Sequence, residues 1–157
     1  MAVTKQEFST TITSFLDLIE QESDILTGNE RELSNLLDNL AVLYHRLTAY
    51  SKEYSPSDTP RRDQNALRKL ITRRFPSFGR YQVSSSVTAT PTPAIIEIGD
   101  SIDDILDITN ELYSVNWLLL HNGIEEAAEY FVVSYDIHWG EHLRTLQLYI
   151  YCIKRGL

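Results

Sequence analysis

Apolar residues recur at the three-and-four-residue spacing of an amphipathic helix through most of this 157-residue chain. The pattern predicts long helices over about residues 4–26, 29–54, 101–122 and 125–155, and a shorter one that ends near Phe75. Thr4 is suited to cap the first of them, and Asp100 or Ser101 is suited to cap the one that follows the loop. Residues 76–98, rich in Ser, Thr and Pro, lack helical spacing and are predicted to form a loop pinned to the core by Ile95, Ile96 and Ile98.

The short connections between most of these segments favour antiparallel neighbours. The length of the chain fits one domain with its own core. The sequence therefore predicts a single all-α domain over residues 1–157, an up-and-down bundle of about five helices with a long loop between the third and the fourth.

Composition excludes several functional classes. The formal net charge is −8, with 22 acidic and 14 basic residues, which disfavours general binding to nucleic acid. Cys152, the single cysteine, has no partner for an internal disulfide, and this suits a reducing cytoplasm. No apolar stretch is long enough for a membrane span. We expect a cytoplasmic protein that binds neither nucleic acid nor membrane, and we find no motif for a nucleotide or another organic cofactor.

Two histidines, His138 and His142, stand one turn apart on the apolar side of the predicted last helix. A histidine that faces inward needs hydrogen-bond partners or a metal ion, because burying it unpaired costs a few kcal/mol. Two interpretations stay open. The histidines either bind a ligand or metal, or they belong to a buried polar network with Thr109, Asn116, Tyr135 and Tyr149.

The segment from His138 to His142 also has the form H-x-x-E-H, in which two histidines hold zinc and Glu141 would act as general base. Zinc enzymes with this pattern need a further ligand and a mixed scaffold, which this chain does not predict. In an antiparallel pair of helices, Asp103 and Asp107 would lie level with the histidines. On a helical wheel, however, these acids lie away from the apolar side, as they would in a solvated acidic face. Their position along the helix axis therefore supports a shared metal site, and their direction around the axis opposes it.

Half of the 14 basic residues lie between residues 61 and 80: Arg61, Arg62, Arg68, Lys69, Arg73, Arg74 and Arg80. Arg68, Arg73 and Arg74 are candidates to contact an anionic partner. The alternative is that this segment neutralises the acidic helix that starts near Asp100.

The chain resembles the bacterial family called domain of unknown function 5063. The resemblance lies in the acidic segment 100–108 and in the segment 134–142, which is similar to the family's block of aromatic-x-x-His-Trp-Gly-x-His. Arg80 and Tyr81 correspond to a tyrosine in the family's connecting loop. The resemblance implies an all-helical fold and a bacterial origin, and it implies no activity.

Two functions follow from these observations. The first is a non-catalytic binding or protein-interaction module, with an unidentified protein partner. The alternative is a small metal-dependent hydrolase in which His138 and His142, with Asp103 or Asp107, hold a divalent metal and Glu141 acts as base. The sequence does not indicate an oligomeric state.

Overall fold

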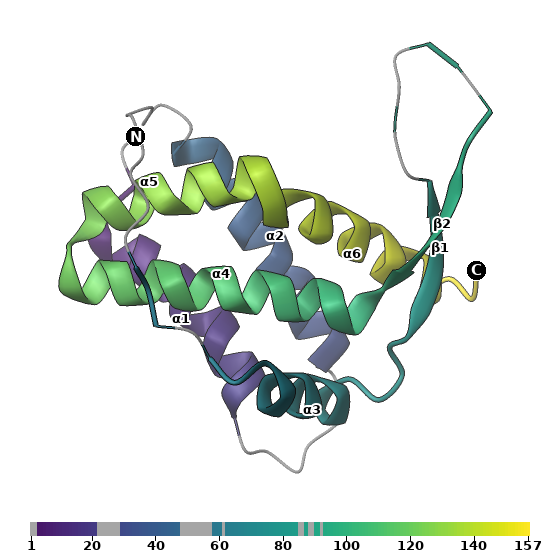
Figure 1. Cartoon of the computed structure of the whole chain (residues 1–157), viewed down its shortest axis with the longest axis horizontal. Helices are drawn as coiled ribbons and strands as arrows, with labels where there is room; N and C mark the ends of the chain where they lie inside the picture. The colour runs from purple at the N-terminus through teal and green to yellow at the C-terminus, as the bar shows by residue number, and fades with distance from the viewer. Residues whose placement is uncertain are drawn as a thin grey trace.

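A computed structural model describes residues 3–21, 29–47, 58–60, 62–84, 87, 90, 91 and 93–157. Within this part of the chain the protein is an all-α bundle, as predicted, with one small hairpin that was not predicted (Figure 1). The elements are α1 (Lys5–Glu20), α2 (Asn29–Leu47), α3 (Gln64–Arg74), β1 (Arg80–Ser84), β2 (Ile96–Asp100), α4 (Ser101–His121), α5 (Ile124–Ser134), the π-helical turn η1 (Tyr135–Trp139) and α6 (Gly140–Ile153).

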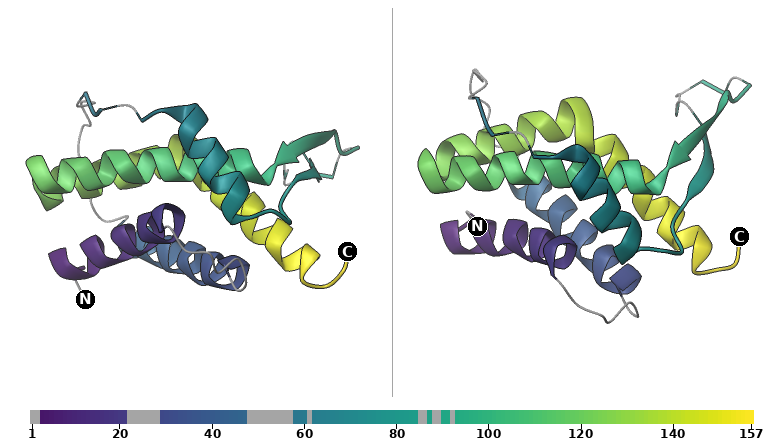
Figure 2. Two further views of the ribbon diagram at one scale, coloured as in Figure 1. Left: turned by 90° about the horizontal axis from the view of Figure 1, so that it is seen from below. Right: turned by 60° about the horizontal axis from the view of Figure 1, so that its bottom comes forward.

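Helix α4 lies at the centre of the bundle and packs against α1, α3, α5 and α6. The α5–α6 segment runs antiparallel to it, and α1 and α2 form a second layer on one side (Figure 2). Large side chains from all these helices fill the space between the layers, and Phe8, Phe15, Leu37, Ile105 and Trp139 are completely buried. This arrangement leaves α4 only a narrow solvent-facing strip.

The predicted caps of the first and fourth helices are confirmed. The hydroxyl of Thr4 accepts the Glu7 N–H at 3.1 Å, and the carboxylate of Asp100 accepts the Ile102 N–H at 3.0 Å. Helix α3 begins at Gln64, after Asp63, whose carboxylate accepts the N–H groups of Asn65 and Ala66. The predicted ends of the first two helices, near residues 26 and 54, lie outside the described residues.

The prediction of a structureless loop over residues 76–98 is wrong in part. β1 and β2 pair as an antiparallel hairpin that stands out from the bundle (Figure 1), with Tyr81 opposite Gly99. Ile95, Ile96 and Ile98 are exposed by 69%, 56% and 65%, so they do not pin this segment to the core. The hairpin is instead anchored at its base, where the hydroxyl of Ser101 donates to the carbonyl of Gly79 at 2.8 Å.

The predicted last helix is not α-helical throughout. At η1 the N–H of Gly140 donates to the carbonyl of Tyr135, five residues earlier, instead of four. The axis of α6 turns away from that of α5 at this point (Figure 2). No helix in the described part of the chain is both long and apolar enough to cross a membrane.

Candidate metal centre

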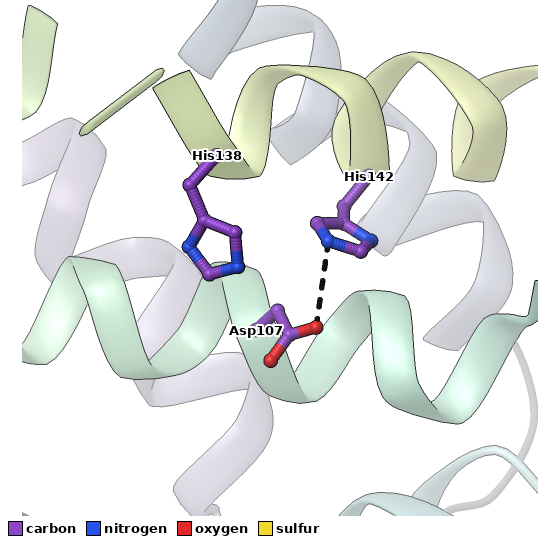
Figure 3. Close-up of side chains that lie close together, drawn as sticks. All are labelled: Asp107, His138 and His142. Atoms are coloured by element: carbon purple, nitrogen blue, oxygen red, sulfur yellow. Dashed lines mark ion pairs between the residues drawn. The ribbon is translucent and has the colours of Figure 1, made fainter. Parts of the chain in front are cut away.

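Three side chains converge where α4 passes the junction of η1 and α6 (Figure 3). Asp107 comes from α4, His138 from η1 and His142 from α6. One nitrogen of each imidazole and one oxygen of the carboxylate lie within 4.8 Å of one another. Nε2 of His142 is 3.5 Å from Oδ2 of Asp107, and a ring nitrogen of His138 is turned toward the same carboxylate.

The other nitrogen of each ring is held by a second carboxylate. Nδ1 of His138 donates to Oε1 of Glu111 at 2.8 Å, and Nδ1 of His142 donates to Oδ1 of Asp104 at 2.8 Å. Because Nδ1 carries the proton in both bonds, Nε2 of each neutral ring keeps its lone pair. Carboxylates hold metal-binding histidines in this way, fixing both the tautomer and the direction of the ring.

Two tyrosines extend these bonds into chains. The hydroxyl of Tyr81, on β1, donates to Oδ2 of Asp104, and the hydroxyl of Tyr130, on α5, donates to Oε2 of Glu111 at 2.7 Å. Each carboxylate therefore accepts one hydrogen bond from a tyrosine hydroxyl and one from an imidazole N–H. The result is two tyrosine–carboxylate–imidazole chains that end on either side of Asp107.

The expectation of a solvated acidic face on the fourth helix is wrong for the acids of this site. Asp104, Asp107 and Glu111 follow one another at steps of three and four, which puts them on one side of α4. That side faces η1 and α6, because Glu111 bonds to His138 of η1 and Asp104 bonds to His142 of α6. The side chain of Asp104 is only 8% exposed.

The electrostatics of the site follow from these contacts. The hydrogen bond from His142 to Asp104 raises the pKa of this histidine, although partial burial opposes the shift. Burial and the bond to Asp104 raise the pKa of Tyr81, so its hydroxyl keeps its proton at neutral pH. The side chains of His138, His142 and Asp107 are 44%, 30% and 35% exposed, so an ion from solution can reach them.

Two residues that the sequence suggested for this site lie apart from it. Asp103 forms an ion pair with Arg68 on α3, so it does not join Asp107 and the histidines. Glu141 is exposed, and its carboxylate does not belong to the converging group of ligand atoms. It is still near enough to His142 to contribute to the raised pKa of that histidine.

The four residues that were predicted to form a polar network with the histidines lie in other contacts. Thr109 is buried and donates to the carbonyl of Ile105 in its own helix. Tyr135 stacks on an aromatic ring of α2, and the hydroxyl of Tyr149 accepts the N–H of Gly79. Asn116 lines a cavity of about 320 Å³ farther along α4. Among the residues that the structure describes, these four form no hydrogen bond with His138 or His142.

The basic residues between positions 61 and 80 have different surroundings, so neither contact with an anionic partner nor neutralisation of the acidic helix describes all of them. Arg68 pairs with Asp103 and so neutralises part of the acidic helix. Arg74 is buried, and its guanidinium donates to the carbonyl of Gln21 at 3.0 Å, so it does not face an external anion. Arg73 is exposed, and Arg61 lies outside the described residues.

The sequence contained part of the signal for the carboxylates and tyrosines that bond around the two histidines, which were not predicted as members of the site. The spacing of Asp104, Asp107 and Glu111 predicts one helical face, and only its direction was misjudged. Tyr130 precedes His138 by eight residues and shares Glu111 with it. Tyr81 is far away in sequence, and only the family resemblance pointed to it.

Two imidazole nitrogens and one carboxylate oxygen form a donor set that suits divalent transition metals. Zinc is bound by such sets with water in the remaining position, and iron(II) by the same three ligand types with open positions. Each metal–ligand bond measures about 2 Å, so ligands on one ion lie at most about 4 Å apart. Small side-chain rotations would bring the present atoms into that range.

The comparisons with known proteins support the fold. No family model matches the chain, and the search of curated proteins gave no match. Among solved structures, the chain is similar to protein BF1032 from Bacteroides fragilis, with a TM-score of 0.63 and 13% sequence identity. The match covers 95% of this chain and 90% of that protein. At this level of identity the likeness shows a shared helical fold and carries no function.

Proposed function

We propose that this protein is a non-catalytic module that binds one divalent transition-metal ion through Asp107, His138 and His142. The observation that carries the proposal is the pairing of both Nδ1 atoms with carboxylates, because it leaves the two Nε2 atoms as acceptors beside Asp107. Asp107 supplies a third possible ligand atom, which lies within 4.8 Å of a ring nitrogen of each histidine.

Charge supports the same proposal. Asp104, Asp107 and Glu111 bring three carboxylates around two imidazoles, and a divalent cation would offset their mutual repulsion. The residues that carry the family resemblance, including His138, Gly140 and His142, are those that build the site. We propose that metal binding is what this block of sequence encodes.

The direct experiment is isothermal titration of the metal-free protein with Zn²⁺ and Mn²⁺, and with Fe²⁺ under anaerobic conditions. We expect one ion per chain for at least one of these metals. The double variant H138A/H142A should bind none at that site, and D107N should bind more weakly. Far-UV circular dichroism would establish that each variant keeps the helical fold.

Matched controls come from residues outside the site. Asp103 lies on the same helix as Asp107 but pairs with Arg68, so D103N should bind the metal as the wild type does. His121 stacks on Trp117 near the end of α4, so H121A removes an imidazole without touching the site. Equal metal binding by the wild type and H138A/H142A would overturn the proposal.

The second candidate function is a metal-dependent hydrolase. It is favoured by the exposure of the three ligands, which would leave room for a metal-bound water of lowered pKa. Its candidate base is Glu141, which is exposed and is not one of the three ligands. Assays with p-nitrophenyl acetate and p-nitrophenyl phosphate separate the two functions. The hydrolase predicts metal-dependent turnover that E141Q reduces, and the binding module predicts none.

A further inference from the structure

Four residues of the α5–α6 segment follow one another at strict four-residue steps: Tyr130, Ser134, His138 and His142. The first and third bond to Glu111, and the last bonds to Asp104, so this row faces α4 along its length. An α-helix turns about 100° per residue, so three steps of four carry a row about 120° around the axis. An uninterrupted α-helix could not hold both Tyr130 and His142 against α4.

The core-facing row has the same spacing. Phe131, Tyr135, Trp139 and Leu143 are separated by four residues each, and all four are buried. A continuous α-helix would rotate Leu143 out of the core by about the same 120°. The π-helical turn takes one additional residue into a turn and so absorbs about 100° of that rotation. This keeps both rows aligned across the junction.

Gly140 is the residue at which the backbone closes this turn. A Cβ atom at position 140 would lie 2.5 Å from the carbonyl oxygen of Tyr135 and 2.8 Å from its ring. The ring has little freedom to move away, because it stacks on Tyr44 at 3.8 Å and meets Trp139 edge-on at 4.8 Å. Any side chain at this position therefore opposes the turn.

We infer that Gly140, by permitting the π-helical turn, is a positioning residue of the metal site. The turn allows α5 and α6 to present the row from Tyr130 to His142 to α4 together. The inference rests on the proposed metal site, and it adds the residue that determines whether the two imidazoles reach Asp107 at the same time.

The test compares G140A with G79A. A Cβ at position 79 meets nothing within 4 Å, so G79A makes the same chemical change without a clash. Metal affinity is measured by titration with Zn²⁺, and the visible spectrum of the Co²⁺-loaded protein reports the ligand geometry. We expect G140A to lose at least about tenfold in affinity, as displaced partners of metal ligands do, and to change the Co²⁺ spectrum. G79A should behave as the wild type does.

A deletion provides the rescue. Ile137 lies within the turn and is 78% exposed. Removing it converts the spacing of both rows to four, three and four, which an ordinary α-helix keeps on one side without a π-helical turn. In G140A lacking Ile137, the clash disappears, and we expect zinc affinity, the Co²⁺ spectrum and thermal stability to recover.

This design stays decisive if G140A alone does not fold, because recovery of folding and metal binding on deletion supports the inference. Wild-type affinity in G140A, or a folded double variant that does not regain the site, overturns it. A wild type that binds no metal is a different result, since it removes the proposed function and is visible before any variant is made.

Discussion

Replacing Asp104 by asparagine tests the part of the site that sequence reasoning missed. The carboxylate accepts hydrogen bonds from Nδ1 of His142 and from the hydroxyl of Tyr81, and the side chain of Asp104 is only 8% exposed. Asparagine keeps the shape but offers one acceptor oxygen, so only one donor can be satisfied as before. If the amide N–H₂ faces His142, Nδ1 must become the acceptor, and the proton moves to Nε2, where the metal would bind.

Loss of such a carboxylate partner weakens metal binding by about 10–100-fold. This range corresponds to about 1.4–2.8 kcal/mol of binding free energy. We therefore expect D104N to bind Zn²⁺ more weakly by this amount in isothermal titration at pH 7.5. D103N removes a neighbouring carboxylate that pairs with Arg68 instead, and it should retain wild-type affinity. Equal affinities for D104N and the wild type would refute the role of Asp104.

Four further predictions concern the same region. In the metal-free protein, an NMR titration should give His142 a pKa above 6.5 that falls in D104N. A histidine whose pKa is raised by folding stabilises the folded protein. This stabilisation is complete below the pKa of the unfolded state and is lost as the pH rises through the pKa of the folded state. The destabilisation of D104N in urea unfolding should therefore be larger at pH 5.5 than at pH 8.5. Y81F should weaken metal binding less than D104N, because the bond from His142 to Asp104 remains. S134A should lower the free energy of unfolding by about 1–3 kcal/mol, because the buried indole N–H of Trp139 donates to this hydroxyl at 2.9 Å and would lose its partner. Unchanged stability in S134A would contradict the last prediction.

The helical fold was predictable because burial of one face imposes a spacing that the sequence displays. The hairpin was missed because strands of five residues give a weak alternating signal beside Ser, Thr and Pro. Tyr81 and Val83 alternate with polar residues, and Ile96 and Ile98 do the same, but the isoleucines face solvent rather than the core. What fixes the hairpin is a set of tertiary bonds at its base, which no local pattern contains.

The sequence predicted three of the residues that converge at the candidate site, and it did not predict their surroundings. His138, His142 and Asp107 were identified from spacing and from the heights that an antiparallel pair of helices gives them. The direction of the acids was misjudged because a helical wheel assumes one buried side. Helix α4 is covered by α1, α3, α5 and α6, so charged residues on it can be buried if they find partners, as Asp104 does.

The π-helical turn is a case in which the sequence held a signal that was not used. Phe131, Tyr135, Trp139 and Leu143 have no three-residue step between them, and a continuous α-helix cannot bury all four on one side. The glycine at position 140 fits this turn, because its close contact is with Tyr135 in the same helical segment.

The most direct test of the proposed metal site is an X-ray diffraction experiment on crystals grown with Zn²⁺, with data collected at the zinc absorption edge. We predict one anomalous peak per chain, within about 2.0–2.2 Å of Nε2 of His138, Nε2 of His142 and a carboxylate oxygen of Asp107. Nδ1 of each ring should remain bonded to Glu111 or Asp104. A structure of the zinc-saturated protein with no peak between these three side chains would contradict the proposed metal site.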